Sequence, residues 1–185
     1  SNGTAGEFYA QSEDEFDRVN QLLAEHCHRA NVPFQIGASH MSAQISVGRI
    51  KRAVMLEPSA IQVILPDWQA LTDEEIITCL QHFAAVAAPI GLILYNPPQS
   101  KRVLKPTSYL RLSKEVPQLV GIKVADGDAT WYAEMRQYAS NLSIFVPGHH
   151  LATGIASGAH GAYSNVSCIN PIGAQKWTDL MATNI

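Results

Sequence analysis

A lysine at the end of a short apolar segment is the residue of this chain with the clearest chemical potential. The segment runs from Leu119 to Lys123, and turn-forming Asp and Gly residues follow it. An apolar run closed by such residues predicts a buried strand. An amine held in apolar surroundings loses hydration, so its pKa falls and its neutral form can attack a carbonyl group to give a Schiff base. The alternative is a strand-end lysine whose ammonium group reaches solvent.

Two hydroxyl-bearing residues can accompany this lysine. Tyr95 ends the preceding apolar strand, and Thr4 lies in a glycine-rich opening segment. In a parallel barrel the carboxyl ends of the strands meet on one face, so Tyr95 and Lys123 can converge there. A phenol beside such a lysine can relay protons, and Thr4 can pass a proton to Tyr95 or hold a substrate carboxylate. The alternatives are an aromatic cover over the barrel rim for Tyr95 and plain turn chemistry for Thr4.

The elements that must position these residues alternate along the whole chain. Ser12 with Glu15, and Thr72 with Glu75, have the spacing of capping boxes at helix starts. Short connections between alternating strands and helices predict βα units and a parallel sheet. The expected helices cover residues 12–30, 42–57, 72–88, 106–114, 128–138, 151–157 and 171 to the end, and the expected strands cover 33–36, 60–65, 90–95, 119–123, 143–146 and 161–164.

The period of the alternation favours one fold class over its rival. Each unit takes roughly 25 to 30 residues, which fits an α/β fold of the (β/α)8 TIM barrel type, and a doubly wound sheet is the alternative. Six full strands are predicted, together with a strand-end fragment at Gly3. The strand count is therefore short of the eight that a closed barrel requires. No linker or composition shift divides residues 1–185, so a single domain is expected.

Composition sets broad limits on function. The chain has 185 residues, 46% of them hydrophobic and 16% charged, as in ordinary soluble proteins. The net charge of -3 offers no electrostatic attraction to nucleic acid or to an anionic membrane, and no apolar run has the length of a membrane span. Cys27, Cys79 and Cys168 lie far apart in apolar surroundings. We expect buried free thiols in a reducing compartment, the cytoplasm.

Four segments in the same order resemble the dihydrodipicolinate synthase/N-acetylneuraminate lyase family. They are Gly3-Thr-Ala-Gly-Glu7, Tyr95-Asn-Pro-Pro98, Gly121-Ile-Lys123 with Gly127-Asp128, and Gly158-Ala-His-Gly161 with Ser164 and Asn165. The resemblance implies a class I aldolase barrel in which Lys123 forms an imine with pyruvate or another 2-oxo acid. It also implies that Tyr95 relays protons, that Thr4 and the backbone at Ala5 bind the substrate carboxylate, and that the carbonyl near Tyr163 lines the same pocket.

Departures from the family pattern bear on the substrate. Ala5 replaces a hydroxyl residue, and Trp68 replaces a tyrosine that reaches into a neighbouring subunit's site in the synthases. Ser100 occupies the position of an arginine that binds the aldehyde's carboxylate, with Lys101 and Arg102 just beyond. These departures favour a lyase or dehydratase for a sugar-derived or aromatic 2-oxo acid over a true dihydrodipicolinate synthase. Trp68 can stack on such a substrate, or it can simply pack within the protein.

Two adjacent histidines complete the set of candidate site residues. His149 and His150 follow the predicted strand over residues 143–146. They can contact the distal end of the substrate or act as acid and base, and the alternative is a surface or packing role.

Length is the second departure from the family. Members have roughly 300 residues, so the resemblance implies that this chain lacks the first strand-helix unit and the C-terminal helices. A truncated or partly traced version of a longer protein is one interpretation of this difference. A barrel without these elements would have an open seam with exposed strand edges.

Three functions remain open at this point. The first is a Schiff-base lyase or aldolase, the second a 2-keto-3-deoxy sugar acid dehydratase with the same machinery, and the third a non-catalytic binding or scaffold protein. A flavin or phosphate-binding barrel ranks below them, because no phosphate-cradling glycine loop follows the last two strands. We expect no metal and no cofactor beyond the covalent imine. By resemblance we expect a homo-oligomer, a dimer or a tetramer.

Overall fold

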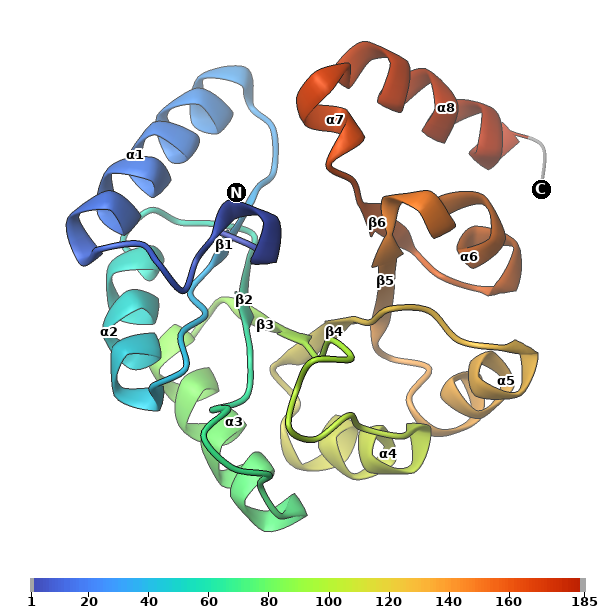
Figure 1. The fold of residues 1–185 in the computed structure, drawn as a ribbon, viewed down its shortest axis with the longest axis horizontal. Coiled ribbons are helices and arrows are strands. Elements are labelled where there is room, and N and C mark those ends of the chain that lie inside the picture. Colours follow the sequence, from blue (N-terminus) through green and yellow to red (C-terminus); the bar gives the residue numbers. More distant parts are fainter. Residues whose placement is uncertain (1, 184–185) are drawn as a thin grey trace.

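A single parallel sheet forms the centre of the structure, a computed structural model that describes residues 2–183. Its six strands follow one another in chain order, and each pairs in parallel with the next. The strands are β1 (Gln35–Gly37), β2 (Ala60–Val63), β3 (Gly91–Tyr95), β4 (Leu119–Lys123), β5 (Ser143–Pro147) and β6 (Gly161–Tyr163). Figure 1 shows that the sheet is curled and that the helices surround its outer side.

The predicted helices are present, and one short helix over residues 166–169 was not predicted. The helices are α1 (Glu13–Ala30), α2 (Ala43–Val54), α3 (Asp73–Ala87), α4 (Pro106–Glu115), α5 (Ala129–Tyr138), α6 (Leu151–Ser157), α7 (Val166–Ile169) and α8 (Pro171–Thr183). Both predicted capping boxes are present, at Ser12 with Glu15 and at Thr72 with Glu75. The predicted end of the last helix lies outside the described residues. No helix among residues 2–183 is long and apolar enough to cross a membrane.

The strand order separates the two fold classes that the sequence left open. A doubly wound sheet reverses its strand order at a switch point, whereas this sheet runs from β1 to β6 without reversal. The architecture is therefore that of a partial (β/α) barrel, with β1 and β6 as its two edges. Part of the gap between these edges is spanned on the inner side, where the Gln35 amide donates a hydrogen bond to the Tyr163 hydroxyl.

Side chains of the strands alternate between two environments, because successive residues point to opposite faces of a sheet. Outward side chains pack against the helices in one hydrophobic core; they include Ile36, Ile61, Val63, Leu92, Leu94, Ile122, Ile144 and Val146. The inner face carries Gln62, Tyr95, Lys123 and Tyr163, which line cavities instead. The core thus lies between sheet and helices, and the inner face is free for chemistry.

The opening segment differs from the prediction. Instead of a strand fragment at Gly3, the structure has a 3-10 turn, η1 (Thr4–Gly6). Glycine at position 37 allows its approach: a Cβ there would lie 2.7 Å from the Asn2 carbonyl oxygen, which is closer than side chains tolerate. The Asn2 amide also donates to the Asn20 side chain of α1 at 2.9 Å. These contacts hold η1 over the end of β1.

A fully buried arginine ties the same segment to the helices. Arg49 of α2 has 0% exposure and donates to the backbone carbonyls of Phe8, Gln11 and Ser39. Its guanidinium also pairs with the carboxylate of Glu13 at 2.9 Å. Burial alone would raise the pKa of Glu13, but the hydrogen bonds from Arg49 and Arg52 outweigh it and lower this pKa.

The cysteines differ in part from the expectation of burial. All three are free thiols, Cys27 and Cys79 are half-buried, and Cys168 is exposed on α7. Cys79 is held by α3, where burial raises the pKa of its thiol to about 11. The apolar neighbours of Cys168 in the sequence do not cover it, because Val166 and Ile169 are themselves exposed.

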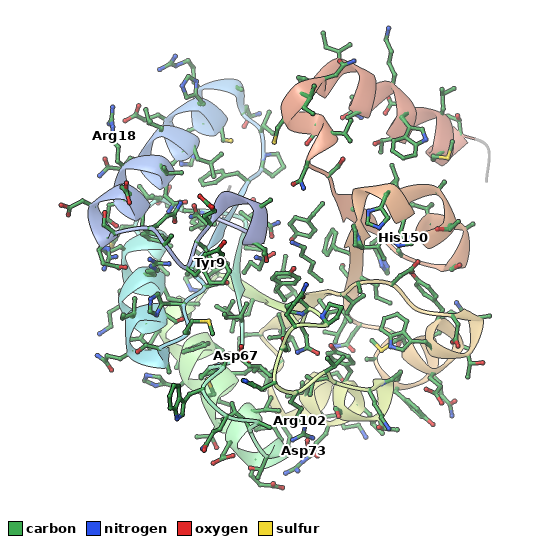
Figure 2. All side chains as sticks on the ribbon, viewed as in Figure 1. Tyr9, Arg18, Asp67, Asp73, Arg102 and His150 are labelled. Atoms are coloured by element: carbon green, nitrogen blue, oxygen red, sulfur yellow. The ribbon has the colours of Figure 1, made fainter. Side chains whose placement is uncertain are left out.

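Replacing Arg49 by methionine tests this arrangement. We expect Arg49→Met to lower the free energy of unfolding by about 3 kcal/mol or more, because three carbonyls and one carboxylate lose their partner in a buried site. Arg18→Met is the matched control, since Arg18 points away from the protein on α1 (Figure 2) and should change stability by less than about 0.5 kcal/mol. Urea unfolding measures both. Equal stability of the two variants would contradict the anchoring role.

Candidate active site

Lys123 lies at the carboxyl end of β4, in the middle of the sheet. Its neighbours in register are Tyr95 at the end of β3 and Phe145 on β5. Gly121 precedes it on the same inner face, and a Cβ at Gly121 would lie 2.9 Å from the Ser143 carbonyl oxygen. A side chain at position 121 would collide with β5, so glycine allows β4 and β5 to pack closely directly below the lysine.

Two aromatic rings surround the lysine amine. The Nζ atom of Lys123 lies 3.9 Å from the ring centroid of Tyr95 and 4.5 Å from that of Tyr163. Contacts of this kind favour the ammonium form, but burial opposes it and lowers the pKa of Lys123. None of the ion pairs in the described part of the chain involves Lys123. The site therefore increases the fraction of neutral, nucleophilic amine.

A hydrogen bond joins the two other predicted catalytic residues. Thr4 Oγ1 lies 3.3 Å from the Tyr95 hydroxyl, and either oxygen can donate. Thr4 belongs to the turn η1, and Ala5 follows it as an exposed residue. Gly3 covers the lysine from the same turn, since a Cβ there would lie 3.9 Å from Lys123 Nζ. The structure thus brings Thr4, Tyr95 and Lys123 together from three separate segments.

Two cavities adjoin this group on the inner side of the sheet. The smaller has a volume of about 60 Å³ and is lined by Asn2, Gly3, Gln35, Gly37, Gln62, Lys123 and Tyr163. The larger, of about 150 Å³, is lined by Thr4, Phe8, Tyr9, Met41, Ile64, Leu65, Asp67, Tyr95, Pro97, Gln99 and Ser100. Lys123 therefore faces the smaller cavity, and the Thr4–Tyr95 pair faces the larger one.

The remaining candidates divide into two groups. Tyr163 lies beside Lys123, and Ser100 lines the larger cavity. Trp68 is 92% exposed and lines neither cavity, so it does not pack within this chain either. His149 is exposed, and His150 pairs with the carboxylate of Asp126, with Nδ1 3.0 Å from Oδ2. Neither histidine lines the two cavities.

The two cations that follow Ser100 are directed elsewhere. Arg102 donates to the Leu71 carbonyl and pairs with Asp73, and Figure 2 shows Arg102 and Asp73 close together at the outer edge, far from Tyr9. Lys101 is exposed, and its backbone N–H donates to Asp67 at 2.8 Å. Neither Lys101 nor Arg102 lines the larger cavity, so the expected substitutes for the family's arginine are absent from it.

Sequence reasoning missed several residues that line the cavities. Gln35 and Gln62 interrupt apolar strand segments, and this interruption is the signal that could have identified inward-facing polar groups. Asp67 was not among the candidates, yet it lines the larger cavity next to the position of Trp68 in the sequence. In the described residues no group of three or more His, Cys, Asp and Glu side chains could hold a metal ion.

Comparisons with solved structures define the class of fold. The chain is similar to a sialic acid aldolase of Ruminococcus gnavus, with a TM-score of 0.87 and 22% identity over 98% of this chain and 61% of that one. It is also similar to a 4-hydroxy-tetrahydrodipicolinate synthase of Methylacidiphilum fumariolicum SolV, with a TM-score of 0.88 and 20% identity over 98% and 61%. At these identities the likeness shows the fold, which is the α/β barrel of these proteins.

Sequence comparison then identifies the family. A model of the dihydrodipicolinate synthetase family matches residues 1–183, so the chain belongs to this family. A 4-hydroxy-tetrahydrodipicolinate synthase of Ehrlichia canis is 31% identical over 130 residues, which are 69% of this chain and 43% of the relative. One of Mesorhizobium japonicum is 29% identical over 171 residues, 91% of this chain and 56% of the relative. The chain thus spans about half the length of these curated relatives.

The lowered pKa of Lys123 has a consequence for stability. Between the lower folded-state pKa and the usual lysine pKa, the unfolded chain binds more protons than the folded one, so stability rises with pH in this window. Below the window the buried ammonium group opposes folding. We therefore expect Lys123→Met to raise the free energy of unfolding at pH 7. This gain in stability should shrink as the pH approaches the pKa of free lysine.

Urea titrations at several pH values measure this gain. Lys101→Met is the matched control, because Lys101 is exposed and its replacement should leave stability within about 0.5 kcal/mol. A loss of stability in Lys123→Met at pH 7 would show that the amine is stabilising and would contradict the assigned desolvation.

Proposed function

We propose that this protein is a Schiff-base-forming lyase or aldolase that acts on pyruvate or a related 2-oxo acid. The observation that carries the proposal is the desolvated amine of Lys123, placed between two tyrosine rings at the carboxyl ends of a parallel sheet. Residues at this end of barrel strands commonly carry catalysis. Membership of the dihydrodipicolinate synthetase family supports the same assignment.

The proposed reaction begins at Lys123. Its neutral amine attacks the C2 carbonyl to give a carbinolamine, which loses water to form an iminium ion. The iminium accepts the electron pair released when a bond at C3 or between C3 and C4 breaks. Tyr95 moves the proton in these steps, with Thr4 hydrogen-bonded to its hydroxyl at 3.3 Å. The Thr4 hydroxyl and the backbone at Ala5 bind the substrate carboxylate.

The residues that line the larger cavity support a particular class of second substrate. It adjoins Tyr95 and contains one carboxylate, Asp67, but neither of the nearby cations. Its remaining wall is largely apolar, with Phe8 and Met41 among the lining residues. A carboxylate here repels an anionic aldehyde and accepts hydrogen bonds from hydroxyl groups. The acceptor or leaving aldehyde is therefore neutral and hydroxylated, which favours a sugar-derived substrate over the anionic aldehyde of a true dihydrodipicolinate synthase.

Assembly is part of the proposal. We infer a homo-oligomer, a dimer or a tetramer, because several large apolar side chains lie at the surface of residues 2–183. Those of α7 and α8 include Val166, Ile169, Ile172 and Leu180, and Trp68 is exposed on the loop after β2. Contact between copies would remove this apolar surface from water.

Borohydride trapping tests the imine. We expect pyruvate and borohydride to add a reduced adduct to Lys123, located by peptide mass mapping, and the Lys123→Met variant to show none. Lys101→Met should label as fully as the original protein, because its amine lies outside the site. Product analysis distinguishes the alternatives: pyruvate among the products excludes the 2-keto-3-deoxy sugar acid dehydratase. Absence of any adduct in folded protein, with pyruvate and with related 2-oxo acids, would leave only a non-catalytic binding or scaffold role.

Replacing Asp67 tests the acceptor. Asp67→Asn keeps the shape and the oxygen that accepts from Lys101 but removes the charge. We expect kcat/KM for succinic semialdehyde, relative to that for glyceraldehyde, to rise about tenfold, since a like charge nearby costs on the order of 1 kcal/mol. Asp14→Asn on the exposed start of α1 is the matched control. An unchanged ratio with intact pyruvate labelling would reject the role of Asp67 without affecting that of Lys123.

A further inference from the structure

The smaller cavity contains more polar groups than imine formation requires. Gln62 of β2 is only 4% exposed, and its amide, which makes no side-chain hydrogen bond among residues 2–183, is accessible from the cavity that it lines. Gln35 of β1 donates from its Nε2 to the Tyr163 hydroxyl, while its Oε1 is buried without a partner among residues 2–183. Both side chains line the cavity that Lys123 faces. One buried amide oxygen without a partner and one amide open to the cavity therefore lie beside the proposed nucleophile.

An unbonded amide oxygen in a buried site has a large cost, so Gln35 Oε1 indicates a missing donor group. Gln35 Oε1 requires a donor, whereas the Gln62 amide offers both a donor and an acceptor. A carboxylate can only accept and a methyl group can do neither. A hydroxyl group both donates and accepts, so it is the simplest group that can bond both glutamines.

The strand register fixes where such a group would lie. Gln62 pairs with Ile93, and Ile93 pairs with Gly121, so Gln62 is level with the residue two positions before Lys123. Gly121 adds no side chain at that level, and the atoms packed over it belong to Ser143 and Phe145. The cavity of about 60 Å³ has room for a small substituent immediately beside the lysine amine. The nearest substituent on a bound 2-oxo acid is the one on C3, the carbon next to the carbonyl.

We propose that Gln35 and Gln62 form a hydroxyl-binding subsite, and that the 2-oxo acid bound at Lys123 carries a hydroxyl group on C3. This inference rests on the proposed function and deepens it by naming the substrate class, the 3-hydroxy-2-oxo acids. With an unsubstituted acid such as pyruvate, water occupies the subsite and supplies the same hydrogen bonds. The subsite therefore holds either a substrate hydroxyl or a water molecule. Labelling by acids that differ only in the group on C3 distinguishes these two cases.

Hydroxypyruvate and 2-oxobutyrate provide this comparison. They are close in size and carry a hydroxyl and a methyl group, respectively, at the same position on C3. Each condenses with the lysine amine, forming the C–N double bond and releasing the carbonyl oxygen as water. Borohydride then adds hydride to the imine carbon, and solvent supplies the proton to nitrogen. The C3 substituent is unchanged, so the two adducts on Lys123 differ in mass and can be counted from one sample.

The measured quantity is the ratio of hydroxypyruvate to oxobutyrate adducts on Lys123 in competition, divided by the same ratio on free N-acetyl-lysine. We expect the protein to favour hydroxypyruvate about tenfold beyond the free amine. Gln62→Leu and Gln35→Leu should reduce this preference to near unity. Gln118→Leu is the matched control and should retain it, because Gln118 is exposed in the turn before β4.

Each outcome decides the proposal. A protein ratio equal to that of the free amine overturns the subsite, as does a preference that survives both leucine variants. Pyruvate labelling of Lys123 without a hydroxyl preference rejects the subsite alone. Failure of all three acids to label Lys123 rejects the proposed function, and the subsite falls with it. If Gln62→Leu does not fold, Gln62→Met replaces it. The adduct ratio of the original protein relative to the free amine tests the subsite without any variant.

Discussion

An amine can act as a nucleophile near neutral pH only where its surroundings disfavour the ammonium form, and this constraint organises the structure around Lys123. Burial lowers its pKa, and no carboxylate in residues 2–183 pairs with it to reverse the effect. The surrounding elements satisfy the same constraint in different ways. β3 and β6 contribute the rings of Tyr95 and Tyr163, and the turn η1 covers the amine with Gly3. The apolar core lies on the other side of the sheet, so stability does not depend on filling this space.

The turn that completes the site is held from outside it. Arg49 bonds to three backbone carbonyls, and two of them, those of Phe8 and Gln11, follow the turn directly. Gly37 and Asn20 hold the chain just before it. Thr4 is thus exposed at the site, yet its backbone is fixed by contacts on both sides. Rigid support of an exposed hydroxyl is what proton relay requires, since small displacements weaken a hydrogen bond steeply.

The sequence predicted the fold because its local signals agree with one another. Capping boxes, apolar strand segments and turn residues all placed boundaries within a few residues of those observed, and the resemblance identified the family. The 3-10 turn at Thr4 was beyond such reasoning, because its position follows from contacts with β1 and α2 that no local pattern encodes. For the same reason the exposure of Cys168 was missed: apolar neighbours in sequence predict burial only if some other element covers them.

The positions of site residues were predictable only where strand register alone determines them. Tyr95 and Lys123 end paired strands, so their proximity followed from topology. The roles of Trp68 and of His149 and His150 stay predictions, since loop residues are placed by contacts that the sequence does not show, and these lie outside both cavities. Arg102 lies just beyond Ser100 in the sequence, but Asp73 and the Leu71 carbonyl hold its guanidinium outside the larger cavity. Gln62 was predictable in principle, as a polar residue at an inward position of a buried strand.

The uninterrupted strand order has a consequence for how the protein is made. Each strand pairs with the one synthesised just before it, so most partners along the sheet are close in sequence. Each pairing closes a loop of one strand-helix unit, so the sheet can be extended in one direction as the chain leaves the ribosome. The Tyr95 strand is then already in place when Lys123 emerges. The lysine stays open to water until the strand carrying Tyr163 is in place, so its burial depends on a strand that follows it in the chain.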